Sequence, residues 1–208
     1  MNYVQILSHP LVEDKMGRLR DHVTQTSDFR RLVEELTLFL CMEATTDLAL
    51  EEKTVTTPVA TTIAKQIAPE IVLAPVLRAG LGMVEGMLRL VPSAKVGHIG
   101  FYRDEKTLMP VEYYVNLPSV QRGIVFLLDP MLATGGTAVA AISLLKQRGI
   151  ADIRLLCLVA APQGIQKVHA QHPDVKIFAT ALDEGLNDNG YIVPGLGDAG
   201  DRIFGTLD

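Results

Sequence analysis

The chain lacks the sequence features that mark several classes of protein. Its apolar runs fall well short of the roughly 18 residues that a membrane-spanning helix needs. Residues 1–10 have neither the basic region nor the apolar core of a signal peptide, so we expect no secretion leader. A formal net charge of −5 argues against nucleic acid as the main partner, because domains that bind it usually present a basic face. We therefore expect no membrane and no nucleic acid among the partners.

Side chains that form disulfides or bind metals are scarce. The two cysteines, Cys41 and Cys157, are too few for a disulfide framework, and Cys157 lies inside the apolar run 155–159. We interpret both as buried thiols in a reducing cytoplasm. His169 and His172 can share a helix face, but no further cysteine or histidine lies near them in the sequence. We interpret them as surface histidines and predict no metal site formed by protein side chains.

The order of the apolar segments predicts one α/β domain over residues 1–208. Residues 1–50 are expected to be helical, mainly over about 11–50, where Ser27 caps a long helix. Short apolar strands then alternate with helices over about 70–180, which predicts a mainly parallel central sheet flanked by helices. The expected strands are 71–77, 96–102, 124–128, 153–161 and 175–180, and the expected helices are 81–90, 136–148 and 163–171.

Two segments depart from this alternation. Residues 103–118 are polar and then strand-like, which predicts a β-arm or hairpin outside the main sheet. Residues 182–208, called the hood below, are rich in glycine, and we expect irregular backbone that approaches another group closely.

The segment 129–137, with the sequence DPMLATGGT, carries the strongest functional signal. It follows an apolar run suited to a buried strand and precedes a helix of small residues. The N–H groups of such a turn and helix N-terminus favour an anion. Asp129 would lie at the carboxyl edge of the sheet, where folds of this class bind ligands. A phosphorylated sugar would use both features, the amides for phosphate and the carboxylate for ribose hydroxyls.

A plainer interpretation of the 129–137 loop stays open. Gly135 and Gly136 are also typical of a tight turn, and Thr134 or Thr137 is a suitable helix N-cap. Neither of the better-known phosphate-binding motifs, G-x-x-x-x-G-K-[ST] and G-x-G-x-x-G, is present in this loop.

Two arginines follow predicted strands at the same edge of the sheet. Arg78 comes after 71–77, and Arg103 comes after 96–102 and begins the polar arm. A guanidinium fork matches phosphate oxygens, so both arginines are candidates for binding pyrophosphate, with Arg103 on a loop that can close over it. The alternatives are an Arg78 that stacks over a helix C-terminus and an Arg103 that is a solvated surface charge.

The hood segment 191–202 has backbone that can match the acceptor, donor and acceptor groups along one edge of uracil, with glycines allowing close approach. From composition alone, a glycine-rich turn that shapes the end of the sheet is the favoured interpretation.

The 129–137 loop, with its preceding apolar strand, resembles the 5-phosphoribosyl-1-diphosphate (PRPP) motif of type I phosphoribosyltransferases. Residues 191–202 and 204–206 resemble the uracil-recognition hood of the uracil phosphoribosyltransferase family. Matching segments also occur at 9–12, 43–45, 75–83, 160–162, 172–175 and 185–187, so that the resemblance covers nearly the whole chain. Pro130 replaces the second acid of many type I motifs, as in the uracil members.

The resemblance implies a type I phosphoribosyltransferase fold and the conversion of uracil and PRPP to UMP and diphosphate. It implies that PRPP is bound by Arg78, Arg103, Asp129, Pro130, Met131, Leu132, Ala133, Thr134, Gly135, Gly136, Thr137 and Asp198. It implies that uracil is bound by Ile192, Gly197, Asp198 and Ala199. Catalysis would rest on Asp129, Arg103 and Asp198, of which Asp198 is the nearest candidate for a general base. Mg²⁺ would be bound mainly through PRPP.

The resemblance also implies a homodimer or a larger homo-oligomer, and it leaves open whether GTP activates the enzyme. Three other functions remain as alternatives. They are a phosphoribosyltransferase for another base, an RNA-binding regulator that keeps the fold, and a sugar-phosphate binding module without catalysis.

Overall fold

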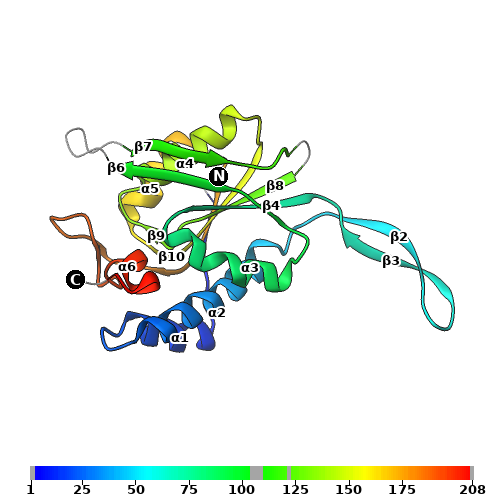
Figure 1. The fold of residues 1–208 in the computed structure, drawn as a ribbon, viewed down its shortest axis with the longest axis horizontal. Coiled ribbons are helices and arrows are strands. Elements are labelled where there is room, and N and C mark those ends of the chain that lie inside the picture. Colours follow the sequence, from blue (N-terminus) through cyan, green and yellow to red (C-terminus); the bar gives the residue numbers. More distant parts are fainter. Residues whose placement is uncertain (1–2, 104–109, 121–122, 207–208) are drawn as a thin grey trace.

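The structure is a computed structural model that describes residues 3–103, 110–120 and 123–206. Its main sheet contains β1 (Val4–Ile6), β4 (Glu70–Leu77), β5 (Lys95–Val96), β6 (His98–Arg103), β7 (Pro110–Asn116), β8 (Gly123–Leu128), β9 (Met131–Leu132), β10 (Asp152–Ala160) and β11 (Lys176–Leu182). The strand order is β1-β11-β10-β8-β4-β6-β7, with β5 beside β4 and β9 beside β10. Every pair is parallel except β6 with β7, so the predicted mainly parallel sheet is confirmed (Figure 1).

Helices cover both faces of this sheet (Figure 1). One face carries α1 (Pro10–Arg20), α2 (Thr26–Ala44), the 3₁₀ helix η1 (Ala79–Met83), α3 (Val84–Leu90) and α6 (Ala199–Phe204), and the other carries α4 (Gly136–Gln147) and α5 (Pro162–Gln171). Alternate residues of β8 point to opposite faces of the sheet. Phe126 packs in the core on the α2 side, whereas Val125 and Leu127 pack in the core on the α4 side. Because both faces are covered, the central strands are continuous apolar runs, which is why the sequence predicted them.

The N-terminal region differs from the prediction of a helical segment. Residues 4–6 form the edge strand β1, which pairs with β11, and three residues are too few to show a periodic pattern. Helix α2 begins at Thr26, so the prediction that Ser27 is its cap is wrong. The residue at the N-cap is Gln25, whose side chain makes no capping hydrogen bond.

The prediction of a separate arm at 103–118 is wrong for its described strand. Strand β7 lies antiparallel to β6 as the edge strand of the main sheet, and residues 104–109 lie outside the described residues. A projecting hairpin occurs earlier in the chain, where β2 (Leu50–Thr56) and β3 (Thr61–Ile67) form a two-stranded sheet of their own (Figure 1). Nearly all of its side chains are exposed, so packing on a core does not impose an alternating apolar pattern on it.

Both cysteines and two of the five histidines, His169 and His172, are buried. Cys41 and Cys157 are buried free thiols, as predicted, and burial raises the pKa of Cys41 to about 11. The prediction that His169 and His172 are surface residues is wrong, because both are buried, and His172 at the C-cap of α5 lies against α4. His172 Nε2 lies 3.0 Å from the Ser143 hydroxyl. Within the described residues, no group of three or more potential metal-ligating side chains is placed to hold an ion.

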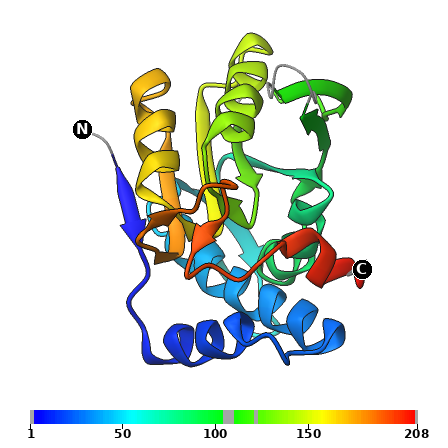
Figure 2. The ribbon, with the colours of Figure 1, turned by 90° about the vertical axis from the view of Figure 1, so that its left-hand side faces the viewer.

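The hood contains more regular structure than the sequence predicts. Strands β12 (Gly185–Leu186) and β13 (Ile192–Val193) form a small antiparallel hairpin, and α6 follows it. Figure 2 shows this segment crossing the end of the sheet, with α6 lying beside α2. The hood therefore covers the carboxyl ends of the central strands. None of the helices in the described part of the chain has the length and apolar character needed to cross a membrane.

Candidate functional site

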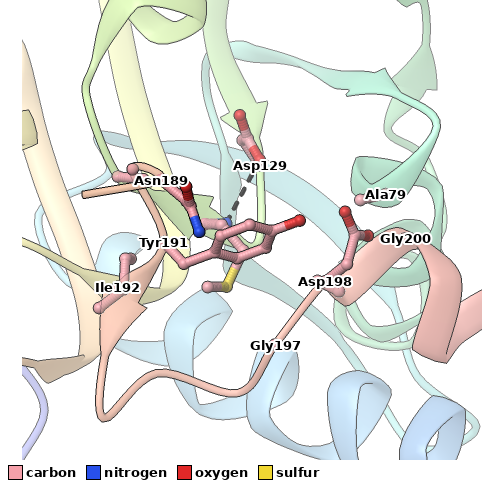
Figure 3. A pocket seen from close by; sticks show the side chains of 12 residues that line it. Ala79, Asp129, Asn189, Tyr191, Ile192, Gly197, Asp198 and Gly200 are labelled. Atoms are coloured by element: carbon pink, nitrogen blue, oxygen red, sulfur yellow. Dashed lines mark hydrogen bonds between the residues drawn. The ribbon is translucent and has the colours of Figure 1, made fainter. Parts of the chain in front are cut away.

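A cavity of about 350 Å³ lies where the hood faces the carboxyl end of the sheet (Figure 3). Its lining comes from the 129–137 loop, from two parts of the hood, and from the turn after β4. The residues are Ala79, Asp129, Met131, Ala133, Asn189, Gly190, Tyr191, Ile192, Gly197, Asp198, Ala199 and Gly200. The structure thus brings all four predicted uracil-binding residues together with Asp129, which is more than sixty positions away in the sequence.

Asp129 is held at the end of β8 by its own backbone. Its N–H donates to the carbonyl of Leu156 on β10, and its carboxylate accepts from the Met131 N–H at 3.3 Å. Burial raises the pKa of the Asp129 carboxyl to about 6, and the hydrogen bond from Met131 offsets only part of that rise. Figure 3 shows its side chain on the wall opposite the hood. A partly buried carboxylate beside a cavity is suited to accept hydrogen bonds from ligand hydroxyls.

The rest of the 129–137 loop lines a second, smaller cavity of about 90 Å³ that shares Asp129, Met131 and Ala133 with the first. Its other lining residues are Leu132, Thr134, Gly135, Gly136, Thr137 and Ala138. The N-cap of α4 is Gly135, with a left-handed φ of 76°, and no side chain caps the helix. The alternative in which Thr134 or Thr137 is an ordinary N-cap is therefore wrong, and the first N–H groups of α4 remain available for an anion.

Of the two predicted arginines, Arg78 alone has a described side chain, and it does not line the cavity. Arg78 follows β4 and is exposed, with Nη2 3.3 Å from Asp201 Oδ1 and its guanidinium over the ring of Phe204, the last residue of α6. This is close to the alternative of an arginine stacked at a helix C-terminus. The side chain of Arg103 lies outside the described residues. Pro130 lines neither cavity; it is buried, and its carbonyl accepts hydrogen bonds from two β10 N–H groups.

Arg78 nevertheless belongs to the same edge of the sheet as the 129–137 loop. A Cβ built on Gly80, in the turn that follows Arg78, would lie 2.3 Å from the carbonyl oxygen of Leu128, the last residue of β8. Only glycine allows the two backbones to come this close. The base of the Arg78 turn is thus packed directly against the strand that presents Asp129.

An ion pair fixes the hood to the body of the protein. Arg20, the last residue of α1, donates two hydrogen bonds to the carboxylate of Asp183 at 2.6 and 2.8 Å, and a third to the carbonyl of Gly195 at 2.6 Å. The same carboxylate accepts from the Gly195 N–H at 2.8 Å. Because Asp183 is only 8% exposed, this bidentate pair is largely removed from water. We call these three residues the hood clasp.

Arg202 provides a second attachment beside the clasp. It donates to the carbonyl of Leu196 at 2.8 Å and to that of Asp21 at 2.6 Å, and its guanidinium lies over the ring of Phe29. The next part of the hood begins α6, where the Asp198 side chain accepts from the Asp201 N–H. The backbone between Gly195 and Asp198 is therefore held at both ends.

Sequence reasoning did not assign five lining residues, which are Ala79, Asn189, Gly190, Tyr191 and Gly200. Three of them, Asn189, Gly190 and Tyr191, belong to a turn that the sequence could have indicated. The Asn187 side chain accepts from the N–H groups of Asn189 and Tyr191, and Gly190 has a φ of 79°. The N-x-N-G sequence that forms this turn predicts a hairpin whose tip carries Tyr191. Figure 3 shows the Tyr191 ring crossing the cavity toward Asp198.

Comparison with known proteins gives a consistent family. A family model described as uracil phosphoribosyltransferase matches residues 6–206. The uracil phosphoribosyltransferase of Streptococcus equi subsp. zooepidemicus is 55% identical over 208 residues, covering 99% of this chain and 100% of the relative. That of Streptococcus pyogenes serotype M1 is 54% identical with the same coverage.

Solved structures share the fold. The AQ2163 protein from Aquifex aeolicus is 42% identical, with a TM-score of 0.93 and 97% coverage of both chains. An adenine phosphoribosyl transferase from Trypanosoma brucei, in complex with AMP, pyrophosphate and ribose-5-phosphate, is 13% identical. Its TM-score is 0.59, with 95% of this chain and 89% of that chain covered. At that identity the likeness concerns the fold alone.

Proposed function

The chain belongs to the uracil phosphoribosyltransferase family, and from that premise we propose which of its residues bind the two substrates. It is a pentosyltransferase of pyrimidine salvage that converts uracil and PRPP to UMP and diphosphate. One observation supports the assignment of residues more than any other: the 129–137 loop and the hood line a common cavity.

The 129–137 loop is proposed to bind the ribose 5-phosphate part of PRPP. The free N–H groups at the start of α4 and the hydroxyls of Thr134 and Thr137 suit the phosphate. The carboxylate of Asp129 suits the 2- and 3-hydroxyls of the ribose. Arg78 and Arg103 are proposed to bind the diphosphate and to offset the charge that builds on it as it leaves. Pairing with PRPP requires Arg78 to exchange its long contact with Asp201 for a phosphate oxygen.

Uracil is proposed to occupy the hood side of the cavity, against Ile192, Gly197, Asp198 and Ala199. The hood clasp and Arg202 hold this backbone in place, so that N1 of the base is aimed at the anomeric carbon. Catalysis is then mainly positioning and electrostatic stabilisation of an oxocarbenium-like centre, with no covalent nucleophile. Asp198 is the proposed general base, since it is the carboxylate on the uracil side of the cavity.

Mg²⁺ is proposed to be bound mainly through PRPP. Asp129 and Asp198 bring carboxylate oxygens, which this ion prefers, to the same cavity, so the donor set fits. When bound, Mg²⁺ would supply positive charge at the diphosphate, while Asp129 orients the ribose hydroxyls. Family membership also supports the proposals of a homodimer or larger homo-oligomer and of GTP activation. The two buried free thiols support a cytoplasmic location.

A coupled assay tests the reaction and the acceptor together. We expect conversion of uracil to UMP that depends on both PRPP and Mg²⁺, with no product from cytosine or hypoxanthine. Turnover of another base in preference to uracil would contradict the hood assignment. Binding of PRPP without release of pyrophosphate would leave only a sugar-phosphate binding module.

Arg103→Ala tests the proposed diphosphate contact. We expect the KM for PRPP to rise, or kcat to fall, by about tenfold, because a charged hydrogen bond to phosphate is lost. The melting temperature should change little. Steady-state kinetics with PRPP varied, together with a thermal melt, make the comparison. Unchanged kinetics with a lowered melting temperature would show that Arg103 is a structural residue.

A further inference from the structure

The phosphate end of the proposed PRPP site contains no cation among its lining residues. The smaller cavity is lined by Asp129, Met131, Leu132, Ala133, Thr134, Gly135, Gly136, Thr137 and Ala138, of which only Asp129 carries a charge. Arg78, which follows β4, and Arg103, the last residue of β6, are assigned to the diphosphate. A phosphate dianion would therefore meet backbone amides and hydroxyls, together with a nearby carboxylate, in a protein whose net charge is −5. A positive charge close to the loop would offset the negative charges of the phosphate and of the Asp129 carboxylate.

Lys167 places its ammonium beside this loop. A Cβ built on Gly136, the first residue of α4, would lie 3.7 Å from Lys167 Nζ and 3.8 Å from Thr134 Oγ1. The ammonium and the hydroxyl thus lie beside the same backbone position at the helix N-terminus. Lys167 is exposed, and it is not one of the lysines that form ion pairs within the described residues, which are Lys15, Lys95, Lys146 and Lys176.

The packing of α5 on the loop accounts for this placement. A Cβ on Gly164, in the first turn of α5, would lie 2.5 Å from the carbonyl oxygen of Ala133. A Cβ on Gly135 would lie 2.8 Å from the carbonyl oxygen of Gly164 and 3.2 Å from Lys167 Cβ. The two backbones are therefore in direct contact, and Lys167, three residues after Gly164, lies on the same side of α5. Its stem is fixed against the loop, although its ammonium reaches solvent.

We propose that Lys167 binds the 5-phosphate of PRPP and of UMP, acting with the N–H groups of α4. The inference rests on the proposed role of the 129–137 loop and adds a residue from a different element. A lysine binds phosphate as a point charge on a flexible side chain. Here Lys167 would bind the 5-phosphate, whereas Arg78 and Arg103 would bind the diphosphate. Removing the charge of Lys167 should therefore weaken ligands that carry the 5-phosphate and leave ligands that carry only the diphosphate unaffected.

Inhibition by ribose 5-phosphate and by pyrophosphate separates the two ends of the site. In Lys167→Gln we expect the inhibition constant of ribose 5-phosphate to rise about three- to tenfold, the KM for PRPP to rise similarly, and the inhibition constant of pyrophosphate to stay unchanged. Lys167→Arg should restore most of the affinity. The matched control is Lys65→Gln on β3, which removes the same charge from the projecting hairpin and should alter neither constant.

Each other outcome overturns the proposal in a recognisable way. If ribose 5-phosphate inhibits Lys167→Gln as strongly as the wild-type protein, Lys167 does not bind the phosphate, while the role of the loop stands. If both inhibition constants rise equally, the substitution has disturbed the whole site. If ribose 5-phosphate fails to inhibit even the wild-type protein, the proposed role of the loop fails together with that of Lys167.

Discussion

Replacing Asp129 by asparagine is expected to lower kcat by about 10²- to 10³-fold while the protein stays folded, as for loss of one electrostatic contact to a transition state. Asparagine keeps the size of the side chain and an oxygen that can accept from the Met131 N–H. It loses the negative charge that is proposed to orient the ribose hydroxyls and to face the developing positive centre. Steady-state kinetics and a circular dichroism spectrum provide the measurement. Wild-type turnover in a folded variant would remove Asp129 from the mechanism.

The same substitution is expected to stabilise the protein at neutral pH. Folding raises the pKa of Asp129 from 3.8 to about 6, so the folded state disfavours the ionised carboxyl. The resulting loss of stability is absent below pH 3.8, grows as the pH rises to about 6, and is complete above it. At pH 7, Asp129→Asn should raise the free energy of unfolding by at most about 3 kcal/mol. Urea unfolding at pH 7 and pH 4 tests this, and an equal gain at both values would contradict it.

Activity should follow the same ionisation. Because the proposed contact with ribose uses the carboxylate, kcat/KM for PRPP in the wild-type enzyme is expected to fall below about pH 6, by up to about tenfold per pH unit. The residual activity of Asp129→Asn should lack this limb of the profile. A variant that retains the limb would assign it to another group.

Replacing Arg20 by methionine is expected to have the second large effect. Methionine fills a similar volume but leaves the buried Asp183 carboxylate without its partner, which costs about 3 kcal/mol when a buried ion pair is broken. The loss of the hydrogen bond to the Gly195 carbonyl also frees the backbone that is proposed to bind uracil. The KM for uracil should therefore rise much more than the KM for PRPP. Urea unfolding and kinetics with each substrate varied in turn are the measurements.

Arg18→Met on the same helix is the matched control. Its ion pair with Asp14 is exposed on both sides, so removal should change the free energy of unfolding by no more than about 0.5 kcal/mol. Neither KM should move. If Arg20→Met raised both KM values equally, the hood clasp would stabilise the whole protein rather than position the uracil side of the site.

The parts of the fold that were predicted correctly are those whose signal is local. Strands β4, β8 and β10 are buried on both faces, so each is an uninterrupted apolar run that can be read without knowledge of its neighbours. The 129–137 loop is likewise one continuous segment, and its turn and helix start are encoded within it.

The missed parts depend on contacts between distant segments or on weak patterns. Arg20 and Asp183 are 163 positions apart, and nothing near either residue in the sequence indicates that they meet. The hairpin β2–β3 has no buried face, so its only signal was β-branched composition, as in Thr54–Thr56, without the alternation that burial imposes. His172 is buried because α5 packs on α4, which its own neighbours in the sequence do not reveal.

The hood clasp also bears on how the enzyme is made. The 129–137 loop and the strands that support it are complete once the chain has been synthesised as far as β11. The proposed uracil-binding wall is complete only when Gly195 and α6 have reached back to the end of α1. Contacts between such distant positions close late, because the entropy of a long loop must be lost first. A growing chain thus completes the 129–137 loop, the proposed sugar-phosphate site, before the hood, the proposed uracil site. We expect a product truncated before residue 183 to keep the proposed 5-phosphate site while lacking Asp198 and the proposed uracil site, and its affinity for ribose 5-phosphate would test that order of assembly.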